Sequence, residues 1–123
     1  MYWEIYLCYT IIKMDIEEMR EYILQKPLVT EGFPFGEDTL VFKVKEKIFF
    51  LAGLNSTPLQ FNVKCDPEKA IELREAYPES ILPGYHMNKK HWNTVIADGT
   101  ITRKLLKEMI DDSYNLVAKI KSR

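Results

Sequence analysis

The chain has 123 residues, of which 46% are hydrophobic and 28% charged, a composition that fits one globular domain and does not favour a disordered chain. Seventeen basic side chains face eighteen acidic ones, and the formal net charge of -1 excludes attraction of nucleic acid or an anionic membrane through the overall field. Residues 64–123 carry eleven basic and nine acidic side chains, so any attraction for phosphate has to be local and to lie in this half.

The amino-terminal segment and the cysteines give no sign of export or membrane insertion. Residues 1–14 are apolar, but they are too short to cross a bilayer, are interrupted by Glu4 and lack the cleavage site of a secretory signal. Cys8 and Cys65 are too few for a disulfide framework, and we expect both to be reduced thiols. The sequence therefore predicts a cytoplasmic protein that does not enter the membrane.

A helix and a hairpin are predicted over the first third of the chain. Asp15 can cap a helix, apolar residues follow at helical spacing, and Pro27 ends the segment. Two runs rich in β-branched and aromatic residues, 39–44 and 48–52, predict the strands of a hairpin. The connection at residues 45–47 has no Gly or Asn, so we expect a loop longer than a tight type I′ turn.

The remaining elements are a strand, a helix, a second hairpin and a last helix. The strand is the most regular, because apolar and polar residues alternate and predict one buried and one wet face. The helix after it has Asp66 as its cap and Pro67 at its first position. In chain order these elements occupy residues 59–65, 67–77, 81–87, 91–97 and 102–120.

The predicted order is helix, three strands, helix, two strands, helix. Strands and helices occur in blocks, without the alternation of a parallel sheet, so the expected class is α+β. We expect a single compact domain at residues 14–123, with an antiparallel sheet and helices packed against it. Residues 1–13 are expected to be an amino-terminal extension, and whether they form a strand, a helix or no ordered structure is left open.

No motif dictates an enzymatic reaction, a cofactor or a metal site. The sequence has no glycine-rich phosphate loop and no nucleophile elbow. His86 and His91 are the only histidines, whereas zinc needs three or four ligands, so a structural or surface role is favoured for both. We expect no enzymatic activity, cofactor or bound metal. An enzyme that uses the histidines with the carboxylates of Glu31, Glu37 and Asp38 is the third alternative.

The stretch from Gly84 to Asn93 is the richest in side chains suited to nucleic acid. Basic groups attract phosphates, aromatic rings stack on bases and amides hydrogen-bond base edges. A purely structural interpretation competes, with Trp92 in the core and residues 88–90 as a solvated turn. The polar face of the sheet, with Lys43, Gln60, Asn62 and Lys64, is a second candidate surface. The candidate nucleic-acid-binding residues are Lys64, Tyr85, His86, Asn88, Lys89, Lys90, His91, Trp92 and Asn93.

Three segments resemble the motifs of the MmcQ/YjbR family in order and spacing, over about residues 14–121. The first is Phe-Pro-Phe-Gly-Glu-Asp-Thr-Leu-Val-Phe-Lys-Val at residues 33–44, and the second is Lys-Cys-Asp-Pro at residues 64–67. The third and most specific is Pro-Gly-Tyr-His-Met-Asn-Lys-Lys-His-Trp-Asn-Thr-Val at residues 83–95. The sequence departs from the family in residues 1–13, which precede the usual start, and at Lys45-Glu46, where a glycine is usual.

The resemblance implies a compact α+β fold of the type III secretion chaperone-like class, sometimes described as a double wing. Family members are commonly labelled DNA-binding, and the resemblance implies no enzyme activity or cofactor. The leading hypothesis is therefore a DNA-binding module that acts through the second hairpin. The alternative is a cytoplasmic, chaperone-like module that binds a protein or a small ligand, for which a homodimer would be unsurprising.

Overall fold

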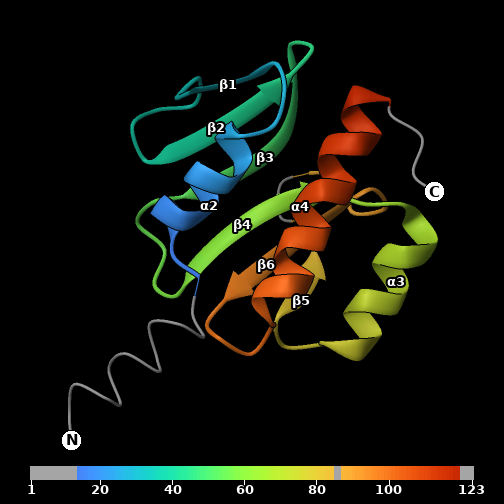
Figure 1. Cartoon of the computed structure of the whole chain (residues 1–123). Coiled ribbons are helices and arrows are strands. Elements are labelled where there is room, and N and C mark those ends of the chain that lie inside the picture. Colours follow the sequence, from blue (N-terminus) through green and yellow to red (C-terminus); the bar gives the residue numbers. More distant parts are fainter. Residues whose placement is uncertain (1–13, 85–86, 120–123) are drawn as a thin grey trace, which may run out of the picture.

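The computed structural model of the chain describes residues 14–84 and 87–119 (Figure 1). The predicted α+β class and antiparallel sheet are confirmed, whereas the predicted extension at residues 1–13 lies outside the described residues. In chain order the elements are α2 (Ile16–Leu24), β1 (Val29–Gly32), β2 (Thr39–Val44), β3 (Lys47–Gly53), β4 (Leu59–Lys64), α3 (Pro67–Ala76), β5 (Ile81–Pro83), β6 (Trp92–Ala97) and α4 (Arg103–Ala118).

The six strands form one antiparallel sheet in the order β1-β2-β3-β4-β6-β5. The sheet has one strand more than the sequence predicted, because β1 lies between the predicted first helix and the hairpin that was predicted to begin at residue 39. This strand is only four residues long and ends at Gly32, so its alternation is too short to recognise. It pairs with β2, where Thr30 lies opposite Lys43, and forms one edge of the sheet.

The connection between β2 and β3 is a two-residue turn, so the prediction of a longer loop was wrong. Val44 pairs directly with Lys47, and Lys45 and Glu46 between them have φ angles of 51° and 65°. Positive φ at both central positions is what a type I′ turn requires. The Lys45 side chain is held as well, because its Nζ donates a hydrogen bond of 2.8 Å to the carbonyl oxygen of Ala118 at the end of α4.

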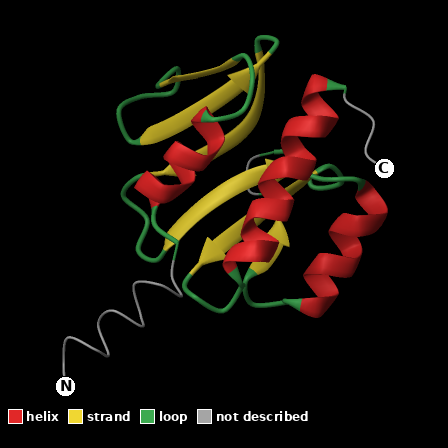
Figure 2. Cartoon of the chain, viewed as in Figure 1, coloured by secondary structure: helices red, strands yellow, loops and turns green. Residues whose placement is uncertain are grey.

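All three helices pack on one side of the sheet (Figure 1; Figure 2). Helix α4 crosses β3 and β4, α2 lies beside β1, and α3 lies at the β5 end of the sheet. Two predicted caps are confirmed, since Asp15 accepts from the Glu18 amide and Asp66 accepts from the amides of Glu68 and Lys69. None of the described helices has both the length and the apolar character needed to cross a bilayer. We call the opposite side of the sheet, which no described helix covers, the open face.

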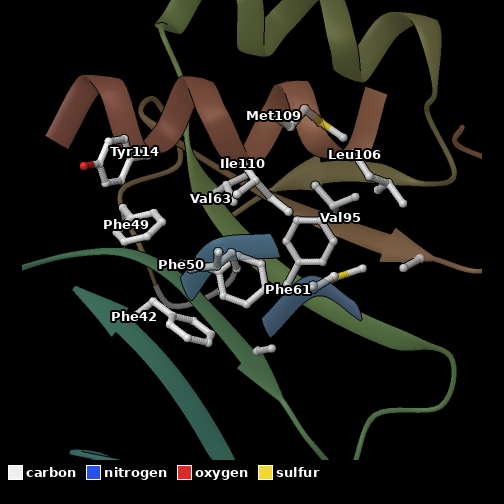
Figure 3. Close-up of a cluster of buried hydrophobic side chains, with 14 of the residues drawn as sticks. Phe42, Phe49, Phe50, Phe61, Val63, Val95, Leu106, Met109, Ile110 and Tyr114 are labelled. Carbon is white, nitrogen blue, oxygen red and sulfur yellow. The ribbon is translucent and has the colours of Figure 1, made fainter. Parts of the chain in front are cut away.

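The core lies between the sheet and α4 and is rich in aromatic rings (Figure 3). Phe50 stacks on Phe61 with a centroid distance of 5.0 Å, and it meets Phe42 edge to face at 5.5 Å. Phe49 meets Tyr114 of α4 edge to face at 5.4 Å. These four phenylalanines are fully buried, so they hold the sheet and α4 together through apolar burial and ring contacts.

A β-bulge explains why two consecutive residues, Phe49 and Phe50, both face the core. The pairing steps from Phe42 opposite Phe50 to Lys43 opposite Ile48, so Phe49 is the extra residue. The buried hydroxyl of Ser113 in α4 donates a hydrogen bond of 2.5 Å to the Phe49 carbonyl. The same hydroxyl accepts one of 2.8 Å from the Lys64 amide. A helix side chain therefore completes the hydrogen bonding where the strand ladder is interrupted.

Candidate nucleic-acid interface

Side chains on the open face lie in rows that run across the strands. The register places one row through the four strands from β2 to β6 and on to β5, with Val41, Leu51, Asn62, Thr94 and Leu82 as successive neighbours. The central pair is polar, and the Thr94 hydroxyl donates a hydrogen bond of 2.6 Å to Oδ1 of Asn62. The predicted polar face of β4 is thus observed, with Gln60, Asn62 and Lys64 turned away from the core.

A groove of about 510 Å³ lies on this face, over β3 and β4. Gly53 has no side chain at this point, and Phe35 and Met87 contribute from the connections before β2 and β6. The groove combines apolar and amide side chains. Its lining residues are Phe35, Thr39, Ile48, Leu51, Gly53, Ser56, Gln60, Asn62, Met87 and Thr94.

Most of the predicted nucleic-acid-binding residues lie where the end of β4 meets the start of β6. Lys64 at the end of β4 lies opposite Trp92 at the start of β6, so the two side chains project from the same face. The turn at residues 88–91 leads directly into Trp92 and carries exposed Lys89 and Lys90 and partly exposed His91. We call this cluster the basic corner, and it consists of Lys64, Lys89, Lys90, His91 and Trp92.

The turn that carries the lysines is ordered by its own hydrogen bonds. The carbonyl oxygen of Asn88 accepts from the amides of His91 and Trp92 at 3.1 and 3.0 Å. Its side-chain Oδ1 accepts from the Lys90 amide at 3.0 Å, so this oxygen stabilises the turn and already has a hydrogen-bond donor. The Lys89 ammonium lies 3.4 Å from the Gly84 carbonyl. The lysines therefore stand on a fixed turn.

Arg74 of α3 holds this turn from behind and was not singled out by the sequence. Its Nη2 donates to the carbonyl oxygens of Lys89 and Trp92, the latter at 3.1 Å, and its Nε donates to Oδ1 of Asn93 at 2.7 Å. Cys65 adds a backbone link, because its amide donates to the His91 carbonyl at 2.7 Å. From the sequence, an arginine in the last turn of a helix is expected to interact favourably with the helix dipole. Its partners here lie 15 to 19 residues further along the chain, and no residue pattern near Arg74 indicates them.

The predicted site residues divide into three groups in the structure. Asn88, Lys89, Lys90, His91 and Trp92 follow one another through the turn into β6, and Lys64 lies opposite Trp92. Asn93 is only 1% exposed and lies on the helix side of β6, where its Nδ2 has no hydrogen-bond partner among the described residues. It therefore acts inside the fold and is not placed to contact a ligand from solvent. Tyr85 and His86 lie outside the described residues.

The lysines of the basic corner have no acidic partner among residues 14–84 and 87–119. Two nearby carboxylates already interact with other groups. Asp112 pairs with Lys69 at 2.6 Å, and Asp66 caps the first turn of α3. The pairing with Asp112 also raises the pKa of the Lys69 ammonium. The corner therefore carries local positive charge although the whole chain is nearly neutral.

Cys65 beside the corner is not an activated nucleophile. It is buried, and burial raises the pKa of its thiol to about 11. A thiol that stays protonated near neutral pH is a poor nucleophile and a poor metal ligand. In the part of the chain that the structure describes, no three His, Cys, Asp or Glu side chains are grouped so that they could hold a metal ion.

Comparison with known proteins places the chain in a family. The sequence profile of the YjbR family matches residues 24–116. The Escherichia coli O157:H7 protein YbdF is 44% identical over 82% of each chain, and YjbR of Escherichia coli K12 is 28% identical over 82% of this chain and 85% of its own; both are described as uncharacterized. A crystal structure of Deinococcus radiodurans protein DR2400 has a TM-score of 0.84 at 42% identity, covering 94% of this chain and 86% of its own. Family profile, relatives and fold agree, and the chain belongs to the YjbR family.

Proposed function

We propose that this protein is a non-enzymatic, cytoplasmic nucleic-acid-binding module that contacts the phosphate backbone of DNA through the basic corner. The observation that carries the proposal is that three lysines near Trp92 have no acidic partner among the described residues: Lys64 lies opposite Trp92 in the sheet, and Lys89 and Lys90 lie on the turn that leads into Trp92. Phosphate contacts by lysine do not need a basic protein overall, only a local cluster that releases counterions.

The neighbouring side chains fit the same role. Trp92 is partly exposed opposite Lys64, and its indole is of the kind that stacks on bases. His91 is also partly exposed and supplies a hydrogen-bonding group beside the lysines. The turn is fixed by Arg74 and by its own backbone, so the lysines lose little conformational freedom of the main chain when they bind.

A salt titration of binding to short single- and double-stranded DNA tests this function. For the wild type we expect log Kd to rise linearly with log salt concentration. The double variant Lys89→Ala/Lys90→Ala should bind more weakly, and its slope should be shallower by about 1 for each lysine that contacts phosphate.

The control is Lys104→Ala, because Lys104 is an exposed lysine in the first turn of α4, on the other side of the sheet from the open face. Its affinity and slope should match the wild type. Absence of binding to either DNA at low salt would refute the proposed function. Binding that Lys89→Ala/Lys90→Ala leaves unchanged would refute the assigned corner.

A second candidate function is the binding of a small ligand, and the groove on the open face is the observation that favours it. Its volume of about 510 Å³ lies within the range of about 300–1,000 Å³ that is usual for ligand pockets. Binding of a free small molecule without any affinity for DNA would favour this candidate.

A further inference from the structure

We infer that the groove on the open face receives one unpaired base of a bound single strand. The inference rests on the proposed function, and it adds the class of nucleic acid and a second contact region. The groove and the basic corner are continuous, because Asn62 and Lys64 are same-face neighbours on β4, and Thr94 and Trp92 are same-face neighbours on β6. A strand whose phosphates lie at the corner therefore has a base within reach of the groove.

The lining of the groove has the two kinds of surface that a base needs. Phe35, Leu51 and Met87 give apolar and aromatic contacts for the face of a ring. Gln60 and Asn62 give amides for its hydrogen-bonding edge.

The amides retain hydrogen-bonding capacity for such a ligand. The Oδ1 atom of Asn62 is taken by the Thr94 hydroxyl, whereas its Nδ2 has no partner among the described residues. The exposed amide of Gln60 has none there either.

Other occupants fit these residues less well. None of the described residues that line the groove is cationic, so a phosphate would find no charge partner among them. A lipid chain or an apolar peptide side chain would cover Gln60 and Asn62 without hydrogen-bonding them, and burying unpaired amides is unfavourable. A base in a duplex is stacked and paired, so its faces are not available to the groove. An unpaired base satisfies both surfaces at once.

The chain provides a matched pair of variants for the apolar contact. Phe33 and Phe35 lie in the same loop and are 51% and 65% exposed, but only Phe35 lines the groove. Phe33 lines a separate hollow beside β1, with Val41 and Lys43. Phe35→Ala should weaken binding of a short single-stranded DNA at least about fivefold, the lower end for loss of one base–aromatic stack. Phe33→Ala should bind like the wild type.

A second pair tests the amide contact. Gln60→Met keeps the size of the side chain and removes its hydrogen bonds, and Gln25→Met makes the same change at an exposed position after α2. Gln60→Met should weaken binding about fivefold and Gln25→Met should not. Neither groove variant should change the slope of affinity against salt, because neither removes a phosphate contact. Both replaced groove residues are exposed, so the variants are expected to fold.

The deciding comparison is between the single-stranded DNA and an abasic chain of the same length, which keeps the phosphates and lacks the bases. The wild type should prefer the base-bearing chain at least about fivefold, and Phe35→Ala should reduce this preference. Equal binding of both chains with a normal salt slope would overturn the inference and leave the proposed function standing. Failure to bind either chain or a duplex at low salt would overturn the proposed function, and binding of the duplex alone would overturn only the inference. Saturable binding of free adenosine in the groove, with no preference for the base-bearing chain, would identify a free nucleoside as the ligand and would also overturn it.

Discussion

The Nε atom of Arg74 donates a hydrogen bond of 2.7 Å to Oδ1 of Asn93, a side chain that is only 1% exposed. This contact joins α3 to β6 just below the turn that carries Lys89 and Lys90. The guanidinium continues to the backbone of that turn, so one side chain supports both the buried amide and the exposed lysines. The geometry of the basic corner therefore depends on a residue outside it.

Replacing Arg74 should destabilise the protein. Arg74→Met leaves the Asn93 amide buried with neither polar atom bonded to a described residue, and an unsatisfied buried group of this kind costs about 1–3 kcal/mol. We expect a loss of this size in the free energy of unfolding, measured by urea denaturation. Arg20→Met is the control, because the Arg20–Glu31 ion pair is largely exposed, and it should have a far smaller effect. Equal losses in the two variants would contradict the role of Arg74.

Gly84 is required by its close approach to Trp92. A Cβ atom at this position would lie 2.8 Å from Cβ of Trp92 and 3.0 Å from its carbonyl oxygen. Gly84→Ala should therefore lower the free energy of unfolding by about 1–3 kcal/mol, as overpacking does. Gly32→Ala is the matched control, since nothing lies within 4 Å of its added Cβ. A thermal melt that shows the same shift for both variants would disprove the steric argument.

Replacing Glu46 by glycine should stabilise the tight turn between β2 and β3. The φ of 65° at Glu46 is unfavourable for a side chain, and glycine adopts this conformation freely. Glu46→Gly should raise the free energy of unfolding by roughly 0.5–1 kcal/mol, after the greater freedom of glycine in the unfolded chain is subtracted. Lys45→Gly should gain less, because it also loses the hydrogen bond to Ala118. A larger gain for Lys45→Gly in urea denaturation would show that this bond contributes nothing.

Because the thiol of Cys65 is buried, we expect the free energy of unfolding to fall at alkaline pH. This thiol has an ordinary pKa of 9.0, and burial raises the pKa in the folded protein to about 11. Below pH 9 both states hold the proton. Between pH 9 and 11 the unfolded state releases it first, so the free energy of unfolding decreases. Cys65→Ala should show a smaller decrease over this range, measured by urea denaturation at several pH values. Parallel curves for wild type and variant would mean that Cys65 does not contribute.

The sequence predicted those features of the fold that arise from local chemistry. Asp15 and Asp66 identified two helix starts, because an N-cap is recognised from residues within one turn. Strand β4 was clear from its alternation. The bulge at Phe49 was not predicted, because two adjacent core-facing residues break the period of two that reveals a strand. The turn at Lys45-Glu46 was missed for a related reason, since the pairing of its flanking strands and not its own residues selects it.

The candidate site was predictable in part. Lys64 and the residues before Trp92 stood out by composition, and the register then brought them to one corner. Arg74 and Phe35 were not singled out as site residues. Arg74 matters because it contacts a segment distant in the sequence, and Phe35 matters because of the shape of the open face. Neither can be predicted from the spacing of neighbouring residues.

Ser113 makes α4 part of the hydrogen-bond ladder of the sheet. Because its hydroxyl joins the Phe49 carbonyl to the Lys64 amide, α4 cannot lift from the sheet without exposing a backbone group of β3 and one of β4. Helix and strands should then open as one cooperative unit, and the Lys64 amide should exchange its hydrogen only when α4 detaches. The strand end that carries the basic corner is in this way as slow to open as the core itself.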